Sequence, residues 1–153
     1  VMDLKIIPDG KVLVTACMDG IVRFFDASSG AIIREQPAHQ NAAQKLAVSQ
    51  DGQLLATAGE DLWVRVWRIS DGKEMASFGL NGELNALFFA DDGRTLIAHE
   101  SLNDQLTFWS VPDQVEVMRL NSLPKGSSVV MSPGSRTIAI QNGTFIRLLR
   151  GAP

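Results

Sequence analysis

Short apolar runs closed by turn residues follow one another along the whole chain. Within residues 38–80 the runs QKLAVS, QLLATAG, WVRVWRI and KEMASFG are rich in β-branched and aromatic residues and are bounded by Gly, Asp and Ser. That composition is typical of β-strands joined by hairpins. No stretch longer than a strand lacks a glycine, a proline or a turn pair, so a helix of ordinary length has no place. The pattern therefore predicts an all-β chain.

The runs recur at a nearly constant pitch. A turn followed by an apolar run repeats as PDGKVLVTA, QDGQLLATA, DDGRTLIAH and PGSRTIAI, whose glycines lie 42, 41 and 41 residues apart. An aromatic residue that ends a strand-like run keeps the same phase, with Phe25, Trp67 and Trp109 spaced 42 residues apart. A repeat of this length constrains architecture more strongly than local propensity does, and it predicts four short strands per unit.

One four-stranded antiparallel sheet with apolar residues on both faces cannot bury itself, whereas sheets stacked face to face around an axis can. We therefore predict a partial β-propeller of three four-stranded antiparallel blades plus three strands of a fourth. Residues 1–153 would form this single segment, with blades at about residues 1–37, 38–80, 81–122 and 123–153.

The period, the turn pairs and the closing aromatic make the whole chain resemble the WD-repeat β-propeller family, named for a Trp-Asp pair that ends the third strand of each blade. The second unit matches the family pattern best. In the family, residues at the matching positions form a hydrogen-bonded set that fixes the loop before the first strand onto the blade. The resemblance therefore implies a structural tetrad, and not an acid–base pair, for His39, Thr57, Asp61 and Trp67.

The other units depart from this pattern. The first has Thr15 and Asp19, but no preceding segment is present to supply its histidine. In the third, an inserted residue lets either Asn103 or Asp104 act as the aspartate, and in the fourth Leu149 stands at the aromatic position. We expect no complete tetrad in the third and fourth units.

Three blades and three further strands make about half of a ring, since WD-type rings usually need roughly six to eight blades to close. Three explanations compete: a fragment of a longer propeller, a half-propeller that pairs with a second copy or another chain, and a small four-bladed ring. We favour the fragment because the chain opens with Val1 and the fourth unit lacks its outer strand. An unclosed arc would expose two apolar blade faces and tend to associate.

Composition and charge argue against several partners. The net charge is −3 and no run of like charge occurs, so the concentrated basic surface that nucleic acid requires is missing. No segment could span a bilayer or looks like a signal peptide, which favours the cytoplasm, although a targeting signal could precede Val1. The single Cys17 excludes an intramolecular disulfide, and we expect it to be a small buried hydrophobe.

No pattern indicates a metal, a cofactor or a catalytic group. Two histidines and one cysteine are too few and too scattered for zinc, and neither a phosphate-binding loop nor a nucleophile elbow occurs. We place His99 at the small polar position of the second strand and expect it to be a buried or half-buried hydrogen-bonding residue and not a catalyst. The carboxylate pairs Glu60-Asp61 and Asp91-Asp92 are expected to support turns.

The resemblance implies a binding function, since ligands in this family meet the face made by the loops before strand one and between strands two and three. Trp63 stands where a small polar residue is usual, and beside Arg65 it would either anchor an interface or pack on the adjacent blade. We interpret the chain as a non-catalytic protein–protein interaction scaffold for a peptide or protein partner. The alternative is a propeller half or accessory domain of a larger hydrolase or oxidoreductase whose active site lies in absent residues. The candidate partner-binding residues are Met18, Glu60, Leu62, Trp63, Asn81, Glu83, Asn103 and Lys125.

Overall fold

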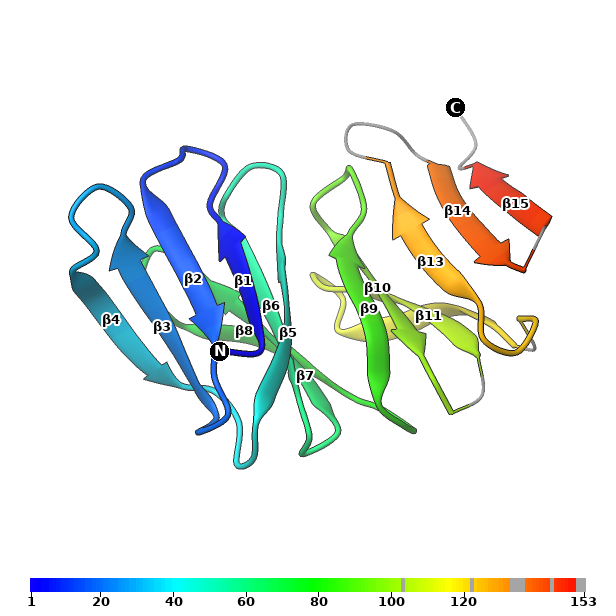
Figure 1. The fold of residues 1–153 in the computed structure, drawn as a ribbon, viewed down its shortest axis with the longest axis horizontal. Helices are drawn as coiled ribbons and strands as arrows, with labels where there is room; N and C mark the ends of the chain where they lie inside the picture. The colour runs from blue at the N-terminus through cyan, green and yellow to red at the C-terminus, as the bar shows by residue number, and fades with distance from the viewer. Residues whose placement is uncertain (103, 122, 133–136, 144, 151–153) are drawn as a thin grey trace.

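The computed structural model describes residues 1–102, 104–121, 123–132, 137–143 and 145–150. Within these ranges, fifteen strands form four antiparallel sheets of four, four, four and three strands, arranged one after another in an arc (Figure 1). This confirms the predicted all-β partial propeller. Among the described residues, no helix is long and apolar enough to cross a membrane.

The strands of each sheet follow chain order. Blade 1 comprises β1 (Asp3–Ile6), β2 (Val12–Ala16), β3 (Ile21–Asp26) and β4 (Ile32–Pro37). Blade 2 comprises β5 (Ala43–Val48), β6 (Leu54–Gly59), β7 (Trp63–Arg68) and β8 (Glu74–Gly79). Blade 3 comprises β9 (Leu84–Phe89), β10 (Thr95–Glu100), β11 (Gln105–Ser110) and β12 (Val115–Leu120). Blade 4 comprises β13 (Ser128–Met131), β14 (Thr137–Asn142) and β15 (Phe145–Arg150).

Each inner blade is apolar on both faces because it is packed between two neighbours. In β6, Leu55 packs into the core shared with blade 1, whereas Ala56 and Ala58 pack into the core shared with blade 3. In β10, Ile97 packs into a third core, which blades 3 and 4 share. Successive side chains of a strand point to opposite faces, so one strand contributes to two separate cores.

The recurring aromatic of blades 1 to 3 and Leu149 of blade 4 occupy one register position, opposite an apolar residue of the second strand. The pairs are Phe25 with Leu13, Trp67 with Leu55, Trp109 with Leu96, and Leu149 with Ile138. Trp67 and Trp109 are both buried. They therefore lie in equivalent places on successive sheets, as the repeat predicted.

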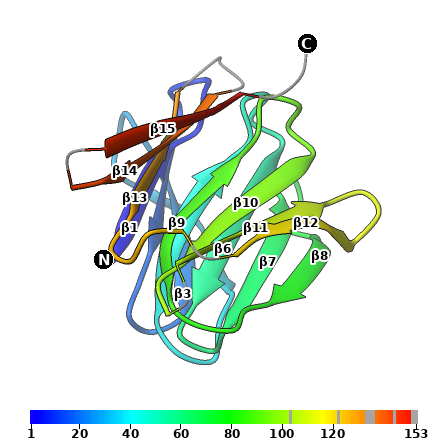
Figure 2. The same cartoon turned by 90° about the vertical axis from the view of Figure 1, so that its right-hand side faces the viewer.

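The blades share an inner and an outer side. Figure 2 shows β1, β9 and β13 along one side of the arc and β8 and β12 along the other, and β5 contacts both β1 and β9. The two end faces of the arc carry exposed apolar side chains. Leu4 and Ile6 are exposed on blade 1, and Val130 and Leu148 are exposed on blade 4.

Candidate functional site: a belt of loops on one face

Four side chains of blade 2 form a continuous line of hydrogen bonds from the core to a turn. The Trp67 Nε1–H donates to Thr57 Oγ1 at 3.0 Å. His39 Nε2 lies 2.8 Å from Thr57 Oγ1, and His39 Nδ1 lies 2.8 Å from Asp61 Oδ1. Because a carboxylate can only accept, we assign the ring proton to Nδ1, so that the Thr57 hydroxyl donates to Nε2. The structure thus brings together the four residues of the expected tetrad.

The electrostatics of this set keep it ionised at one end and neutral at the other. Burial lowers the pKa of the His39 imidazole below its ordinary 6.5, outweighing the hydrogen bond with Asp61 that raises it. Burial raises the pKa of the Asp61 carboxyl, but hydrogen bonds from His39 and Arg65 outweigh it and leave that pKa below its ordinary value. Arg65 Nη1 donates to Asp61 Oδ2 at 2.8 Å, on the second carboxylate oxygen. Both ring nitrogens of His39 are engaged and its side chain is fully buried, so the set fixes a loop and offers a substrate no free group.

The His39 ring lies directly over a glycine at the end of the second strand. A Cβ added at Gly59 would meet both Cγ and Nδ1 of His39 at 2.5 Å. By strand register, the position of Gly59 is held by Glu100 in blade 3 and by Asn142 in blade 4. The corresponding residue of blade 1 is Cys17, which is buried, as expected, with its Sγ 3.6 Å from Thr15 Oγ1.

In blades 3 and 4 the side chain at the position of Gly59 holds the loop before the first strand, as His39 does in blade 2. The buried Glu100 carboxyl accepts the Asn81 N–H at 2.7 Å and the Thr107 hydroxyl at 3.3 Å. Asn142 Nδ2 donates to the Lys125 carbonyl at 2.8 Å. The contacts with Asn81 and Lys125 each tie the loop before the first strand to the end of the second strand. Neither residue was predicted from the sequence, because the family pattern has a histidine in the loop; the polar residues that align with Gly59 in the repeat are the signal that marks them.

The placement of His99 at the small polar position was wrong. Ala98 lies opposite Thr107, two residues before Trp109, just as Thr57 lies opposite Arg65, two residues before Trp67. Ala98 therefore holds the position of Thr57, and His99 lies one residue beyond it. Its ring therefore points to the other face, toward the core between blades 3 and 4, where its strand partner Leu106 packs.

The expected hydrogen bond of His99 is also missing. The ring is fully buried, but neither nitrogen has a hydrogen-bond partner among the described residues, and Nε2 stays 3.8 Å from Asp104 Oδ1. Burial lowers the pKa of this imidazole too. His99 is therefore neutral at neutral pH, with both ring nitrogens short of partners.

Turns and interstrand loops from all four blades join into a belt along one face. The loop belt comprises residues 17–20, 38–43, 59–63, 80–83, 101–102, 104 and 123–127. Backbone hydrogen bonds connect each segment to the next. They run from His39 to Gly20 at 3.0 Å, Glu60 to Ala42 at 2.9 Å, Leu80 to Leu62 at 2.8 Å, Ser101 to Glu83 at 2.8 Å, and Leu123 to Asp104 at 3.0 Å. These bonds hold the segments to one another, and the side chains of His39, Glu100 and Asn142 hold the belt to the strands.

Seven of the eight expected partner-binding residues lie on the loop belt and are exposed, whereas Asn103 lies outside the described residues. Their exposed apolar members are Met18 at 72%, Leu62 at 41% and Trp63 at 43%. The polar members are Glu60, Asn81, Glu83 and Lys125. The Arg65 guanidinium stands 5.9 Å from the Trp63 ring centre, within reach of a weak cation–π contact.

The expected turn carboxylates are found at turns. Asp92 accepts the backbone N–H groups of Arg94 and Thr95, each at 2.8 Å, and Asp61 accepts that of Trp63 at 3.3 Å. Across the described ranges, no three His, Cys, Asp or Glu side chains are grouped so that they could hold a metal ion.

Comparison with known proteins gives matches to two family models and to a related sequence. Residues 1–43 match the family model for the anaphase-promoting complex subunit 4 WD40 domain, and residues 30–68 match that for the WD domain, G-beta repeat. The protein groucho of Drosophila melanogaster is 27% identical over 115 residues, which are 74% of this chain and 16% of groucho.

Solved structures match nearly the whole chain. The β-propeller domain of Myceliophteria thermophila Cps50 (Swd1) superposes with a TM-score of 0.78 at 18% identity, covering 91% of this chain and 48% of that one. The structure of U3-55K superposes with a TM-score of 0.76 at 17% identity, covering 98% of this chain and 51% of that one. The chain thus spans about half the length of each of these two structures.

Proposed function

The chain belongs to the WD-repeat β-propeller family, and from this premise we propose that it is a non-catalytic scaffold that binds a peptide or protein segment on the loop belt. Propellers of this family generally act as protein-interaction scaffolds. The tetrad supports a non-catalytic role, since its histidine and aspartate are used up in holding a loop.

The observation that carries this proposal is the pair Leu62 and Trp63. Leu62 has a φ of 61°, a left-handed conformation that is costly for a branched side chain. Its N–H donates to the Gly59 carbonyl at 3.1 Å, and its own carbonyl accepts the Leu80 N–H. The turn therefore holds two large apolar side chains at the surface on a backbone that is already ordered. Such preorganised aromatic groups are typical anchors of protein interfaces.

Peptides selected from a random displayed library on the immobilised chain would test this function. We expect a selected peptide to lose at least about tenfold in affinity for Trp63→Ala, with a nearly unchanged Tm, because Trp63 is 43% exposed and belongs to no buried core cluster. Ile33→Ala on β4 removes a similarly exposed apolar side chain away from the belt and serves as the control. Equal binding by both variants, or a large loss of stability in Trp63→Ala, would refute the proposed anchor.

A further inference from the structure

The exposed apolar side chains of the loop belt continue from blade 2 into blade 3. The Leu62 carbonyl accepts the Leu80 N–H at 2.8 Å, so the turn of blade 2 lies against the loop that begins blade 3. A Cβ added at Gly82 in that loop would lie 2.9 Å from the Leu102 Cβ, so Leu102 lies directly beside Gly82. Leu102 is 73% exposed. Leu62, Trp63 and Leu102 therefore form an apolar strip across the junction of the two blades.

The belt around this apolar strip is acidic. It carries five carboxylates against one lysine: Asp19, Glu60, Asp61, Glu83 and Asp104 against Lys125. Asp19 and Asp61 each pair with an arginine at 2.8 Å, and Asp104 is buried. The two glutamates are exposed, and neither forms an ion pair with another described residue. The Glu60 carboxylate accepts the neutral Gln44 amide at 3.1 Å, which leaves its charge in place. Two negative charges of the belt are therefore free to pair with a partner.

Backbone hydrogen bonds set the order of these groups along the belt. The Glu60 N–H donates to the Ala42 carbonyl in the loop between blades 1 and 2, so Glu60 lies on the blade 1 side of Leu62. The Glu83 carbonyl accepts the Ser101 N–H at 2.8 Å and the Ser101 hydroxyl at 3.1 Å, so Glu83 lies between the turns of blades 2 and 3. Acidic and apolar positions therefore alternate along the belt. Their order is Glu60, Leu62, Glu83 and Leu102.

A partner segment with basic and apolar residues fits this surface better than a neutral or an acidic one. An acidic segment is repelled by Glu60 and Glu83, and a neutral apolar segment covers their charges without replacing the lost water. The stems of lysine and arginine pack on apolar groups while their charged ends reach a carboxylate. A second copy of this chain does not qualify, because it carries no run of basic residues.

We propose that the loop belt at the junction of blades 2 and 3 recognises a cationic segment of a partner protein, in which lysine or arginine adjoins apolar residues. Glu60 and Glu83 pair with the basic side chains, and the apolar strip packs against the apolar ones. This inference rests on the proposed scaffold function and specifies its partner. Because the pairing charges are exposed, they contribute mainly to the association rate and to the choice of partner, and salt screens them.

Selection of peptides against a charge-reversed variant tests this preference. Random heptapeptides displayed on phage are selected in parallel on the immobilised chain and on the double variant Glu60→Lys, Glu83→Lys. We expect the peptides from the unmodified chain to be rich in lysine and arginine beside apolar residues, and those from the variant to be rich in aspartate and glutamate. The Tm of the variant should be nearly unchanged, since both glutamates are exposed.

A selected peptide that carries a fluorescent label then measures the effect in an anisotropy titration. The double variant should bind it at least about tenfold more weakly, because two attractive pairs become repulsive. Glu60→Gln together with Glu83→Gln should give a smaller loss, and raising NaCl from about 50 to about 500 mM should weaken binding to the unmodified chain. The control Glu74→Lys reverses an exposed carboxylate on β8, away from the belt, and should have no effect.

Three outcomes separate this inference from the function on which it rests. Peptides that bind the chain and the double variant equally, yet lose affinity for Trp63→Ala, would leave the scaffold function in place and overturn the cationic preference. An affinity that does not change with salt would overturn that preference as well. Failure to select any peptide on the chain would refute the scaffold function, and the inference would fall with it.

Discussion

Gly59 is the position at which a single methyl group tests how the loop belt is fixed. A Cβ there would lie 2.5 Å from two ring atoms of His39 and 2.9 Å from the His39 Cβ, closer than real Cβ atoms come. Gly59 does not have a positive φ, so alanine suits its backbone. The substitution Gly59→Ala therefore acts by displacing the imidazole.

The cost follows from the bonds that the displaced ring gives up. The hydrogen bond to the ionised Asp61 contributes about 1.5–3 kcal/mol, and that with Thr57 contributes about 1 kcal/mol. Replacing glycine by alanine restricts the unfolded chain and returns about 0.4–1 kcal/mol. We expect a net loss of about 2–3 kcal/mol, which lowers the Tm of a domain of this size by about 4–12 °C.

Thermal unfolding followed by circular dichroism at pH 7.5 measures this loss. Gly79→Ala is the matched control, because it lies in the same sheet, also lacks a positive φ, and an added Cβ meets nothing within 4 Å. A double-mutant cycle with His39→Ala identifies the cause, since Gly59→Ala should cost nothing further once the ring is gone. Equal Tm values for Gly59→Ala and Gly79→Ala would refute the reasoning, as would an undiminished cost in the His39→Ala background.

Two further predictions concern blade 3 and acid stability. Glu100→Gln places an amide N–H₂ against one of two donors and should cost about 1–3 kcal/mol, whereas Glu83→Gln, an exposed change on the loop that Glu100 holds, should leave the Tm unchanged; similar values for the two would contradict the role of Glu100. Burial lowers the pKa of both His39 and His99, so the unfolded chain binds protons more readily; stability is fully present above pH 6.5 and is lost as pH falls through the lowered folded values. His99→Leu should weaken this pH dependence and raise the Tm at pH 7.5, because it removes a buried ring without partners, and a lower Tm would show that the ring is hydrogen-bonded after all.

The sequence by itself determined the number, type and order of the strands. Turn chemistry and residue alternation are local, and they recur in phase, so the ends of β5 to β8 agree with the apolar runs to within one residue. The tetrad was expected from the resemblance of the second unit to the WD-repeat family. Trp67 and Trp109 were expected on equivalent positions of successive sheets because each repeat forms one blade.

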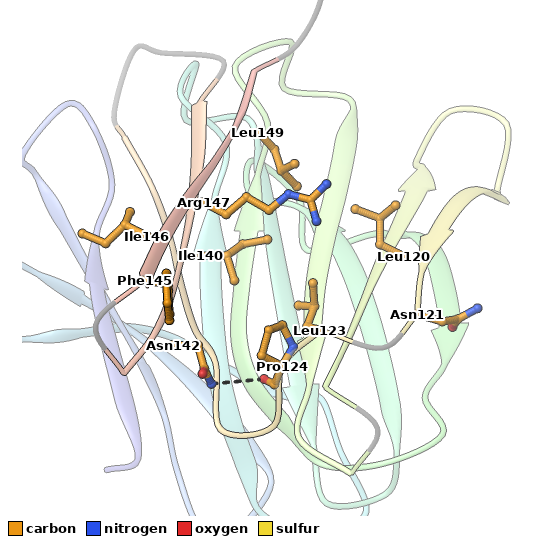
Figure 3. A pocket seen from close by; sticks show the side chains of 10 residues that line it. All are labelled: Leu120, Asn121, Leu123, Pro124, Ile140, Asn142, Phe145, Ile146, Arg147 and Leu149. Carbon is orange, nitrogen blue, oxygen red and sulfur yellow. Dashed lines mark hydrogen bonds between the residues drawn. The ribbon is translucent and has the colours of Figure 1, made fainter.

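Only the tertiary structure decided which side chain holds the loop before the first strand in each blade. In blades 3 and 4, Glu100 and Asn142 at the end of the second strand hold the loop that His39 holds in blade 2. That equivalence depends on strand register and not on residue type. His99 was misplaced because a shift of one residue turns a side chain to the other face of a sheet. Leu120 of β12 and Leu149 of β15 line one pocket although they belong to different blades and are 29 residues apart in the chain (Figure 3). Such contacts depend on how blades stack, and a periodic pattern along one chain specifies the stacking without specifying how well each interface is filled.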